Sequence, residues 1–219
     1  MTPWCTTSLV NRCYWCRAST EIYGLIGGGV FVRHRVLSAA SILRADDSAG
    51  ARSRWSYLEL ADELQRYSAD PRADMVDMFR RIVFNALVSN TDDHPKNHAV
   101  VARGGPAFRL APAYDLTPSP RPPGNDVHLA MACGSAGTIA CRENIVASSG
   151  TFGLSRDAAN AIIETMRAII ANEWERDVRY HGEMTADVAA IAPAFANPAS
   201  ERTIDIADKQ MAARRTRQK

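Results

Sequence analysis

The sequence lacks several features that define large classes of protein. No run approaches the roughly 20 consecutive apolar residues that span a bilayer, and no apolar signal core follows a basic start at the N-terminus. Basic and acidic residues number 26 and 24, so the formal charge is only +2. A charge so small implies no global attraction to nucleic acid or to an anionic membrane. A cytoplasmic protein that binds neither directly is the simplest interpretation.

The cysteines do not indicate a disulfide framework. There are five, an odd number in a chain of 219 residues, which fits reduced thiols better. Cys13 and Cys16 form a CxxC pair, but a structural zinc site usually needs two such pairs. Cys133 and Cys141 lie far along the chain and seven residues separate them, so we interpret all five as free thiols.

The chain also lacks a G-x-G-x-x-G loop for phosphates. Glycines 27–29 instead predict a turn or hairpin that connects two segments. Composition is otherwise that of a globular protein, with 46% hydrophobic residues and enough length for one sizeable core. We divide the chain into a poorly specified segment (1–30), a folded domain (31–200) and a C-terminal tail (201–219) that is basic between Arg214 and Lys219.

Periodic apolar residues predict a mainly helical α+β domain. Asp70 and Pro71 are typical of a helix start, and the apolar residues after them recur at helical spacing up to Asn90. Ser56 is a suitable cap for a helix that ends near Tyr67. We expect its apolar face to comprise Leu58, Ala61, Leu64 and Gln65. Further helical segments are expected at 36–43, from Ser155 to near Gly182, and at 185–195.

Two short strands are expected at 98–102 and 107–110, joined by a turn at 103–106 as a β-hairpin. In an antiparallel pair, the entry of the first strand and the exit of the second lie at the same end. Asn97 precedes the first strand and Asp115 follows the second. We therefore expect these two residues to lie close together.

The segment Asn90–Asn97 has the residues of a phosphate-transferring loop. Asp92 and Asn97 are five residues apart, which is the spacing of the protein-kinase loop in which an Asp accepts the substrate hydroxyl proton and an Asn binds magnesium. Magnesium prefers hard oxygen ligands, which Asn97 and Asp115 offer. In this hypothesis Asp92 is the catalytic base, and Lys96 offsets charge on the γ-phosphate.

Two other interpretations apply to the same loop. His94 and His98, with Asp92 and Asp93, form a set of possible transition-metal ligands. Pro95 argues against a helical pair, because a proline disfavours the helical conformation at the residue before it. Alternatively, Thr91 and Asp92 cap a turn and their neighbours are solvated. The combination of loop, hairpin and second Asp favours the phosphate site.

Two motifs resemble one known family. Thr91-Asp-Asp-His-Pro-Lys-Asn97 resembles the Thr-Asp-Gly-His-x-Lys-Asn loop of the HipA-like toxin kinases, and Leu110-Ala-Pro-Ala-Tyr-Asp-Leu116 resembles their Leu-x-Pro-x-Tyr-Asp motif. Segments 36–43 and 57–61 also look like those that precede the catalytic helix of the family. The resemblance covers roughly residues 30 to 200.

The resemblance implies a kinase-like C-lobe, with its catalytic and metal loops on a short hairpin. It implies an ATP- and magnesium-dependent serine/threonine kinase from a bacterial toxin–antitoxin system. Asp92 is then the catalytic base. His94, Lys96, Asn97, Tyr114 and Asp115 would bind the nucleotide, with Asn97 and Asp115 on the metal. The best-known relatives phosphorylate an aminoacyl-tRNA synthetase and are held by a DNA-binding antitoxin.

Two departures from the family pattern affect this expectation. Asp93 replaces a glycine, so it adds a negative charge beside the phosphates unless its side chain points away. The chain also begins after the position where the family has an N-terminal lobe that helps to hold ATP, so a truncated or split gene is expected. Two functions follow: a catalytic lobe that needs an N-lobe from another chain, or an inactive remnant that binds an antitoxin as an interaction module.

Overall fold

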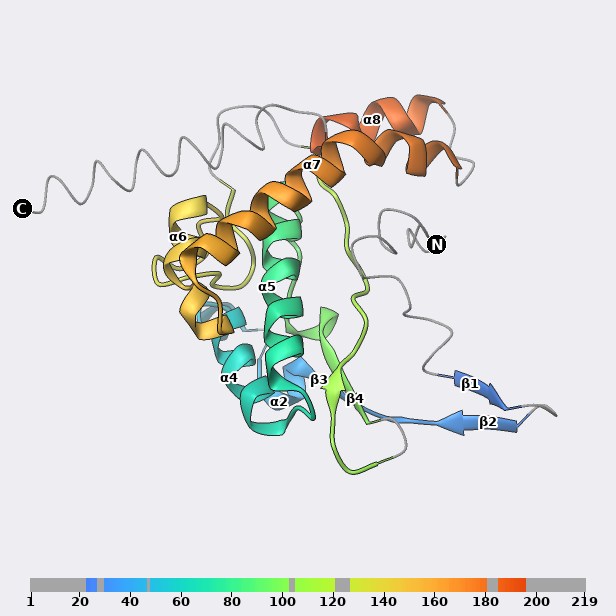
Figure 1. Ribbon diagram of the computed structural model, residues 1–219, viewed down its shortest axis with the longest axis vertical. Helices are drawn as coiled ribbons and strands as arrows, with labels where there is room; N and C mark the ends of the chain where they lie inside the picture. The colour runs from blue at the N-terminus through green and yellow to red at the C-terminus, as the bar shows by residue number, and fades with distance from the viewer. Residues whose placement is uncertain are drawn as a thin grey trace, which may run out of the picture.

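Helix α5 (Pro71–Leu87) runs through the middle of the molecule, with α4 (Tyr57–Tyr67) beside it and α7 (Arg156–Tyr180) crossing it (Figure 1). The computed structural model describes residues 23–26, 30–46, 48–102, 105–120, 127–180 and 185–195. Helices dominate these ranges, as the sequence predicts. The other elements are β1 (Tyr23–Ile26), β2 (Val30–Arg33), β3 (Arg35–Ser38), α2 (Ala39–Ile42), α3 (Ala49–Arg52), η1 (Pro95–Asn97), β4 (Ala99–Ala102), β5 (Arg109–Leu110), α6 (Arg142–Ala147), η2 (Ser149–Phe152) and α8 (Thr185–Phe195).

Helix α5 begins where the sequence predicts. The Asp70 side chain accepts a hydrogen bond from the Ala73 amide at 3.1 Å, and Pro71 occupies the first turn, where a missing N–H costs nothing. Its apolar face is buried between α4, α7 and η2. That face comprises Met75, Met78, Phe79, Ile82, Val83, Ala86 and Leu87, all of which were expected in the core.

The end of α5 is a Schellman turn without a glycine. Ser89 has the left-handed backbone conformation (φ 54°), and the Asn90 amide donates to the Asn85 carbonyl at 2.8 Å. The side chains of the same two residues repeat the contact, because Nδ2 of Asn90 donates to Oδ1 of Asn85 at 3.0 Å. This double link sets the direction in which the chain leaves the helix.

The predicted hairpin is part of a three-stranded antiparallel sheet in the order β3-β4-β5. In it, Val100 lies opposite Leu110, and the Ala111 amide donates to the Ala99 carbonyl at 2.8 Å. The predicted helical turn at 36–43 was wrong in its first half, because residues 35–38 form β3 and only 39–42 are helical. Pairing with β4 overrides the local pattern there.

The other predicted helices are confirmed, but the buried face of one of them, α4, was predicted incorrectly. The Ser56 hydroxyl accepts from the Leu58 amide at 3.1 Å and begins α4. The α4 face that reaches the core contains Tyr57 and Leu60, whereas the expected Leu58 is only half buried and Gln65 is exposed. The helices after Ser155 and at 185–195 have the predicted bounds within a few residues. The sequence did not predict α6 and η2.

Some expectations fall outside the described ranges. These are the fold of residues 1–22 and 201–219 and the glycine turn at 27–29. The strands that flank those glycines, β1 and β2, pair antiparallel. No helix in the described part of the chain is long and apolar enough to cross a membrane. Cys133 and Cys141 are buried thiols, and burial raises the pKa of Cys133 to about 12.

Candidate functional site

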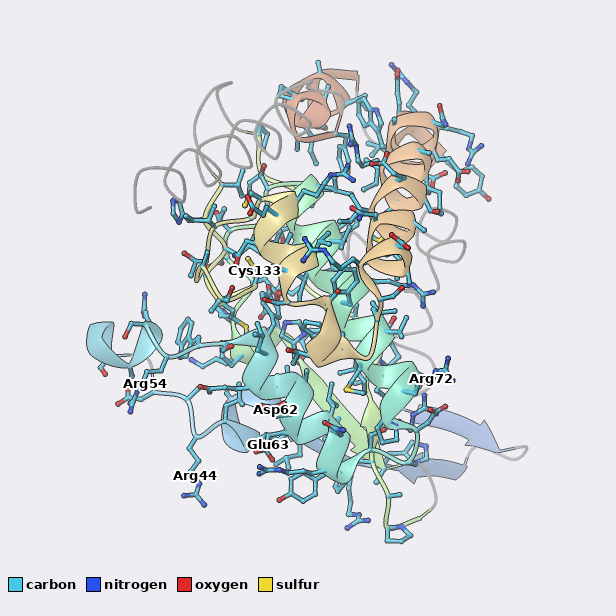
Figure 2. All side chains as sticks on the ribbon, turned by 60° about the vertical axis from the view of Figure 1, so that its left-hand side comes forward. Arg44, Arg54, Asp62, Glu63, Arg72 and Cys133 are labelled. Carbon is cyan, nitrogen blue, oxygen red and sulfur yellow. The ribbon has the colours of Figure 1, made fainter. Side chains whose placement is uncertain are left out.

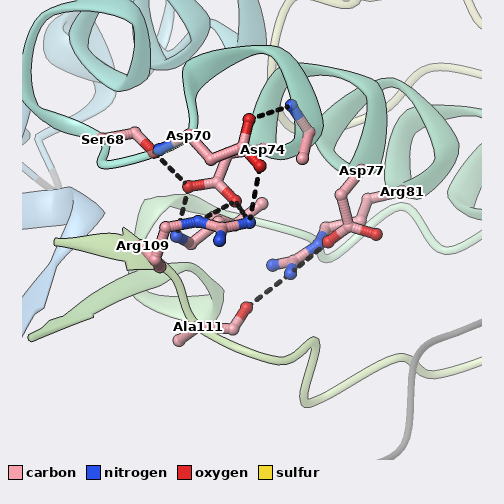
Figure 3. Close-up of polar contacts among 9 residues, drawn as sticks. Ser68, Asp70, Asp74, Asp77, Arg81, Arg109 and Ala111 are labelled. Carbon is pink, nitrogen blue, oxygen red and sulfur yellow. Dashed lines mark hydrogen bonds and ion pairs between the residues drawn. The ribbon is translucent and has the colours of Figure 1, made fainter. Parts of the chain in front are cut away.

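The chain that leaves β5 is attached to the first turn of α5 by one buried carboxylate (Figure 3). Asp74 accepts from Nε and Nη2 of Arg109 at 3.0 and 2.9 Å and from the Leu110 amide at 2.8 Å. Ser68 donates its hydroxyl to the same carboxylate at 2.5 Å. Asp74 is 3% exposed, so these donors replace the water that the charge loses on burial. The start of the segment that ends at Asp115 is therefore fixed.

Two further contacts continue along α5. Arg81, which is 1% exposed, donates through Nη2 to the Asp77 carboxylate at 2.9 Å and to the Ala111 carbonyl (Figure 3). Just past the end of α5, the Val88 carbonyl accepts from the Ser119 amide at 3.0 Å. The strand exit thus follows α5 from Asp74 to its C-terminus and is held on both sides of Asp115.

Tyr114 joins this segment to the Asn90–Asn97 loop. Its hydroxyl donates to the Lys96 carbonyl at 2.8 Å. Burial raises the pKa of Tyr114, and the nearby charges of Asp93 and Asp115 raise it as well, so the phenol is a neutral donor. Asp115, the next residue, has the left-handed conformation (φ 57°), which is uncommon outside glycine and is found more often at functional sites.

The loop itself folds around a short 3-10 turn. His94 is extended (ψ 170°), as expected for a residue before proline, and η1 follows it. Asn97, which is 6% exposed, donates Nδ2 to the Asp92 carbonyl at 3.4 Å. The described residues contain no other hydrogen bond to this amide, so Oδ1 of Asn97 is left available as a ligand.

The carboxylates around α5 fall into two groups. Asp74 accepts from the Leu110 amide, Asp77 accepts from Arg81 one turn later on the same helix, and Asp93 accepts from Asn85. Asp92 and Asp115 are exposed, and within the described ranges neither carboxylate has a hydrogen-bond or ion-pair partner. Unengaged carboxylates on ordered loops are suited to a cation or a substrate hydroxyl.

Asp93 does not lie beside the expected phosphate position, because its side chain is fully buried. Its Oδ2 accepts from the Tyr57 hydroxyl, from Nδ2 of Asn85 at 2.6 Å and from Nε2 of His98 at 2.9 Å. Burial alone raises the pKa of Asp93, but His98, Tyr57 and Arg81 together bring it below its ordinary value of 3.8. The charge added at this position therefore points inward and is compensated.

The transition-metal interpretation is not supported. His98 is 1% exposed and its Nε2 is bonded to Asp93, whereas the His94 ring meets Trp55 edge-on at 6.3 Å between centroids. Among the described residues there is no group of three or more His, Cys, Asp or Glu side chains placed to hold a metal ion. This does not bear on a magnesium site, which uses amide and carboxylate oxygens with water.

A cavity of about 320 Å³ lies beside the loop. Trp55 is among the residues that line it, and the same ring contacts His94. Arg44 and Arg54 also line the cavity, and both project away from the body of the protein (Figure 2). None of the expected site residues lines this cavity.

The supporting residues were missed by sequence reasoning. Asp74, Asp77, Arg81 and Asn85 recur every three or four positions along α5, next to its apolar stripe. Such a row on a helix usually indicates a solvated face. Asp74, Arg81 and Asn85 are instead buried. Their role becomes visible only once the loops that they contact are known.

Comparison with known proteins gives two findings. The family model described as the HipA-like C-terminal domain matches residues 19–174. A solved structure from Shewanella oneidensis MR-1, the complex of the toxin–antitoxin system proteins HipA and HipB with operator DNA, contains a chain with the same fold: the TM-score is 0.66 at 17% identity. The match covers 85% of the present chain and 50% of that chain, so the present chain spans half its length. No curated protein sequence matches the chain.

Proposed function

The chain belongs to the HipA-like C-terminal domain family, and from this premise we propose that it supplies the catalytic base and the metal ligands of a magnesium- and ATP-dependent serine/threonine kinase of a toxin–antitoxin system. The domain division at residues 31–200 and the roles of the site residues belong to the same proposal. The observation that carries it is the Tyr114–Lys96 hydrogen bond of 2.8 Å, because it joins the two motifs that carry the resemblance.

The residues present fit a magnesium ion. Oδ1 of Asn97 and the carboxylate of Asp115 are hard oxygen ligands, and both are free of other partners in the described part of the chain. When bound, the ion neutralises charge on the phosphate oxygens. Asn97 is held by the Asp92 carbonyl, and Asp115 is held between the Arg81 and Val88 contacts. We propose that this ordering of the backbone lowers the cost of placing both ligands.

Asp92 is proposed as the base that accepts the proton of a substrate serine or threonine hydroxyl. Its carboxylate is exposed, so a protein substrate can reach it. The Asn97 side-chain amide donates to the Asp92 carbonyl at 3.4 Å, so the base and the metal ligand belong to one turn. His94 and Lys96 lie between them and, with Tyr114, are proposed to bind the nucleotide phosphates.

The test compares Asp92→Asn and Asp115→Asn with the unchanged chain. Asn replaces each carboxylate without a change of size, and it tolerates the left-handed conformation at position 115. We expect phosphate transfer from ATP to fall by roughly 10²–10⁴-fold in each variant, with Mg²⁺ dependence weakened only in Asp115→Asn. Full transfer in both variants would contradict the site assignment.

The partners of this proposal are a DNA-binding antitoxin and a protein substrate such as an aminoacyl-tRNA synthetase. Support for the first is that the similar HipA chain was solved with HipB and operator DNA. The same observation favours a second candidate function, an inactive module that binds an antitoxin. A titration with Mg²⁺ and ATP separates the two: the kinase proposal requires binding by the chain alone or after a HipA-type N-terminal lobe is added, and the module requires none.

A further inference from the structure

Adjacent carboxylates in the loop face opposite ways. Asp92 is exposed, whereas Asp93 is 0% exposed and forms part of no proposed catalytic step. A buried ionised carboxylate needs hydrogen bonds to offset its lost hydration. Three donors meet that need at Asp93 Oδ2, and each comes from a different part of the fold.

The three donors connect the loop to two helices. Tyr57 is the first residue of α4, and Asn85 lies in the last turn of α5. Burial, and then the charge of Asp93, raise the pKa of Tyr57 well above 10, so this hydroxyl is a neutral donor. Asn85 also accepts from Nδ2 of Asn90, so the same side chain holds the start of the loop and its centre.

The third donor closes the loop on itself. His98 directly follows Asn97, and its Nε2 lies 2.9 Å from Asp93. Because an ionised carboxylate only accepts, this nitrogen carries the proton. This contact is buried and joins residues 98 and 93. A second, outer bond joins the adjacent pair, because Nδ2 of Asn97 donates to the Asp92 carbonyl. An inner and an outer hydrogen bond therefore brace the same short turn.

We propose that Asp93 is a positioning residue, which holds Asp92 and Asn97 in register by bonding to Tyr57, Asn85 and His98 beneath them. This inference rests on the proposed function, because it concerns the same site. Asp93 acts through the backbone of the loop and touches no substrate atom. It differs from a purely structural buried carboxylate in one respect: its removal loosens this turn more than it loosens the rest of the domain.

The test uses the full chain and two separate variants of it, each with one substitution at position 93. Asp93→Ala removes all three hydrogen bonds. Asp93→Asn can keep an acceptor oxygen at the Oδ2 position and place its NH₂ at Oδ1, which has no partner among the described residues. Asn144→Ala is the matched control, because Asn144 is equally buried and its Nδ2 donates to the Gly137 and Ile139 carbonyls at 3.1 and 2.8 Å.

Two readouts are required. Amide hydrogen exchange of residues 90–98 should accelerate by about tenfold or more in Asp93→Ala relative to residues 133–140, and the pattern should reverse in Asn144→Ala. Turnover of Mg·ATP at saturating ATP should fall about 100-fold in Asp93→Ala, with KM for ATP changed less than threefold. Asp93→Asn should recover much of both losses.

The outcomes separate the two claims. Equal acceleration in both segments, or a turnover loss no larger than that of Asn144→Ala, would show that Asp93 only stabilises the fold and would overturn the inference. An unchanged chain that neither binds nor turns over Mg·ATP, with or without an added N-terminal lobe, overturns the proposed function. In that case the exchange comparison still decides whether Asp93 orders the loop.

Discussion

Helix α5 has one apolar face and one polar face, and the two do different things. One packs apolar side chains such as Phe79 and Ile82 against neighbouring helices. The other uses Asp74, Arg81 and Asn85 to hold the strand exit and the Asn90–Asn97 loop. Apolar contacts are non-directional and tolerate small shifts, whereas hydrogen bonds specify where a backbone group lies. The apolar face therefore maintains the domain, and the polar face determines the geometry of the candidate site.

The largest stability effect is expected on the apolar face. Phe79 is fully buried and its ring lies 5.6 Å from that of Phe152 between centroids. Phe79→Ala should lower the free energy of unfolding by about 3–5 kcal/mol, because it removes buried surface and leaves a cavity. Denaturant unfolding measures this loss. Mg·ATP affinity of the molecules that remain folded should be unchanged, and a specific loss of affinity would break the division between the faces.

A smaller stability loss with a larger functional effect is expected from Asp74→Ala. The change leaves the Leu110 amide and the Arg109 guanidinium without their acceptor, which should cost about 3 kcal/mol. Because this carboxylate fixes the segment that ends at Asp115, affinity for Mg²⁺ with ATP should also fall. Asp62, an exposed carboxylate on α4, provides the control (Figure 2): Asp62→Ala should change neither quantity. Unchanged Mg²⁺ affinity in Asp74→Ala would contradict the claim that the polar face of α5 determines the geometry of the candidate site.

The contact of Asp93 with Asn85 on the polar face should also make the stability of the domain sensitive to acid. The folded pKa of Asp93 is below its ordinary value. A depressed carboxyl pKa contributes stability above the unfolded value of about 3.9, and that contribution is lost as the pH falls through the folded pKa. Unfolding curves collected from neutral pH to about pH 2 should therefore bring the unchanged chain and Asp93→Asn closer together in acid. A constant difference would mean that the ionised form is not stabilised.

The smallest effect concerns the turn at the C-terminal end of α5. Ser89 has φ 54° where glycine has no steric penalty. Ser89→Gly should stabilise the chain by about 0.5–1 kcal/mol, measurable as a higher thermal midpoint. The site should keep its activity, because Gly preserves the backbone path into Asn90. A destabilised variant would indicate that the Ser89 side chain itself supports the turn.

Sequence reasoning predicted the parts of this fold that depend on local rules. The start of α5 at Asp70, its buried stripe and the hairpin after His98 follow from capping preferences and periodicity. It did not predict that residues 35–38 are a strand, because pairing with β4 decides that. The same limit applies to Asp93: its type suggested charge beside the phosphates, whereas partners distant in sequence place it in the core.

The residues of the candidate site were predicted on different grounds. Asp92, Asn97 and Asp115 were predicted from spacing and residue type, which reflect what a magnesium and phosphate site needs, and their roles stay predictions. Tyr114 was found by resemblance, and its hydrogen bond to the Lys96 carbonyl now links the two segments. Arg81 and Asn85 had no signal in the sequence, because a charged or amide side chain on a helix has no defined role until its partner is known.

We propose that the loops anchored on the polar face of α5 present Asn97 and Asp115 as one magnesium and phosphate site. Isothermal titration of the chain with ATP in the presence of Mg²⁺, alone and with an added HipA-type N-terminal lobe, tests it most directly, with Asp115→Asn titrated beside it. We expect saturable Mg²⁺-dependent binding in at least one condition and its loss in Asp115→Asn. Binding that Asp115→Asn leaves intact, or no binding in either condition, would contradict it.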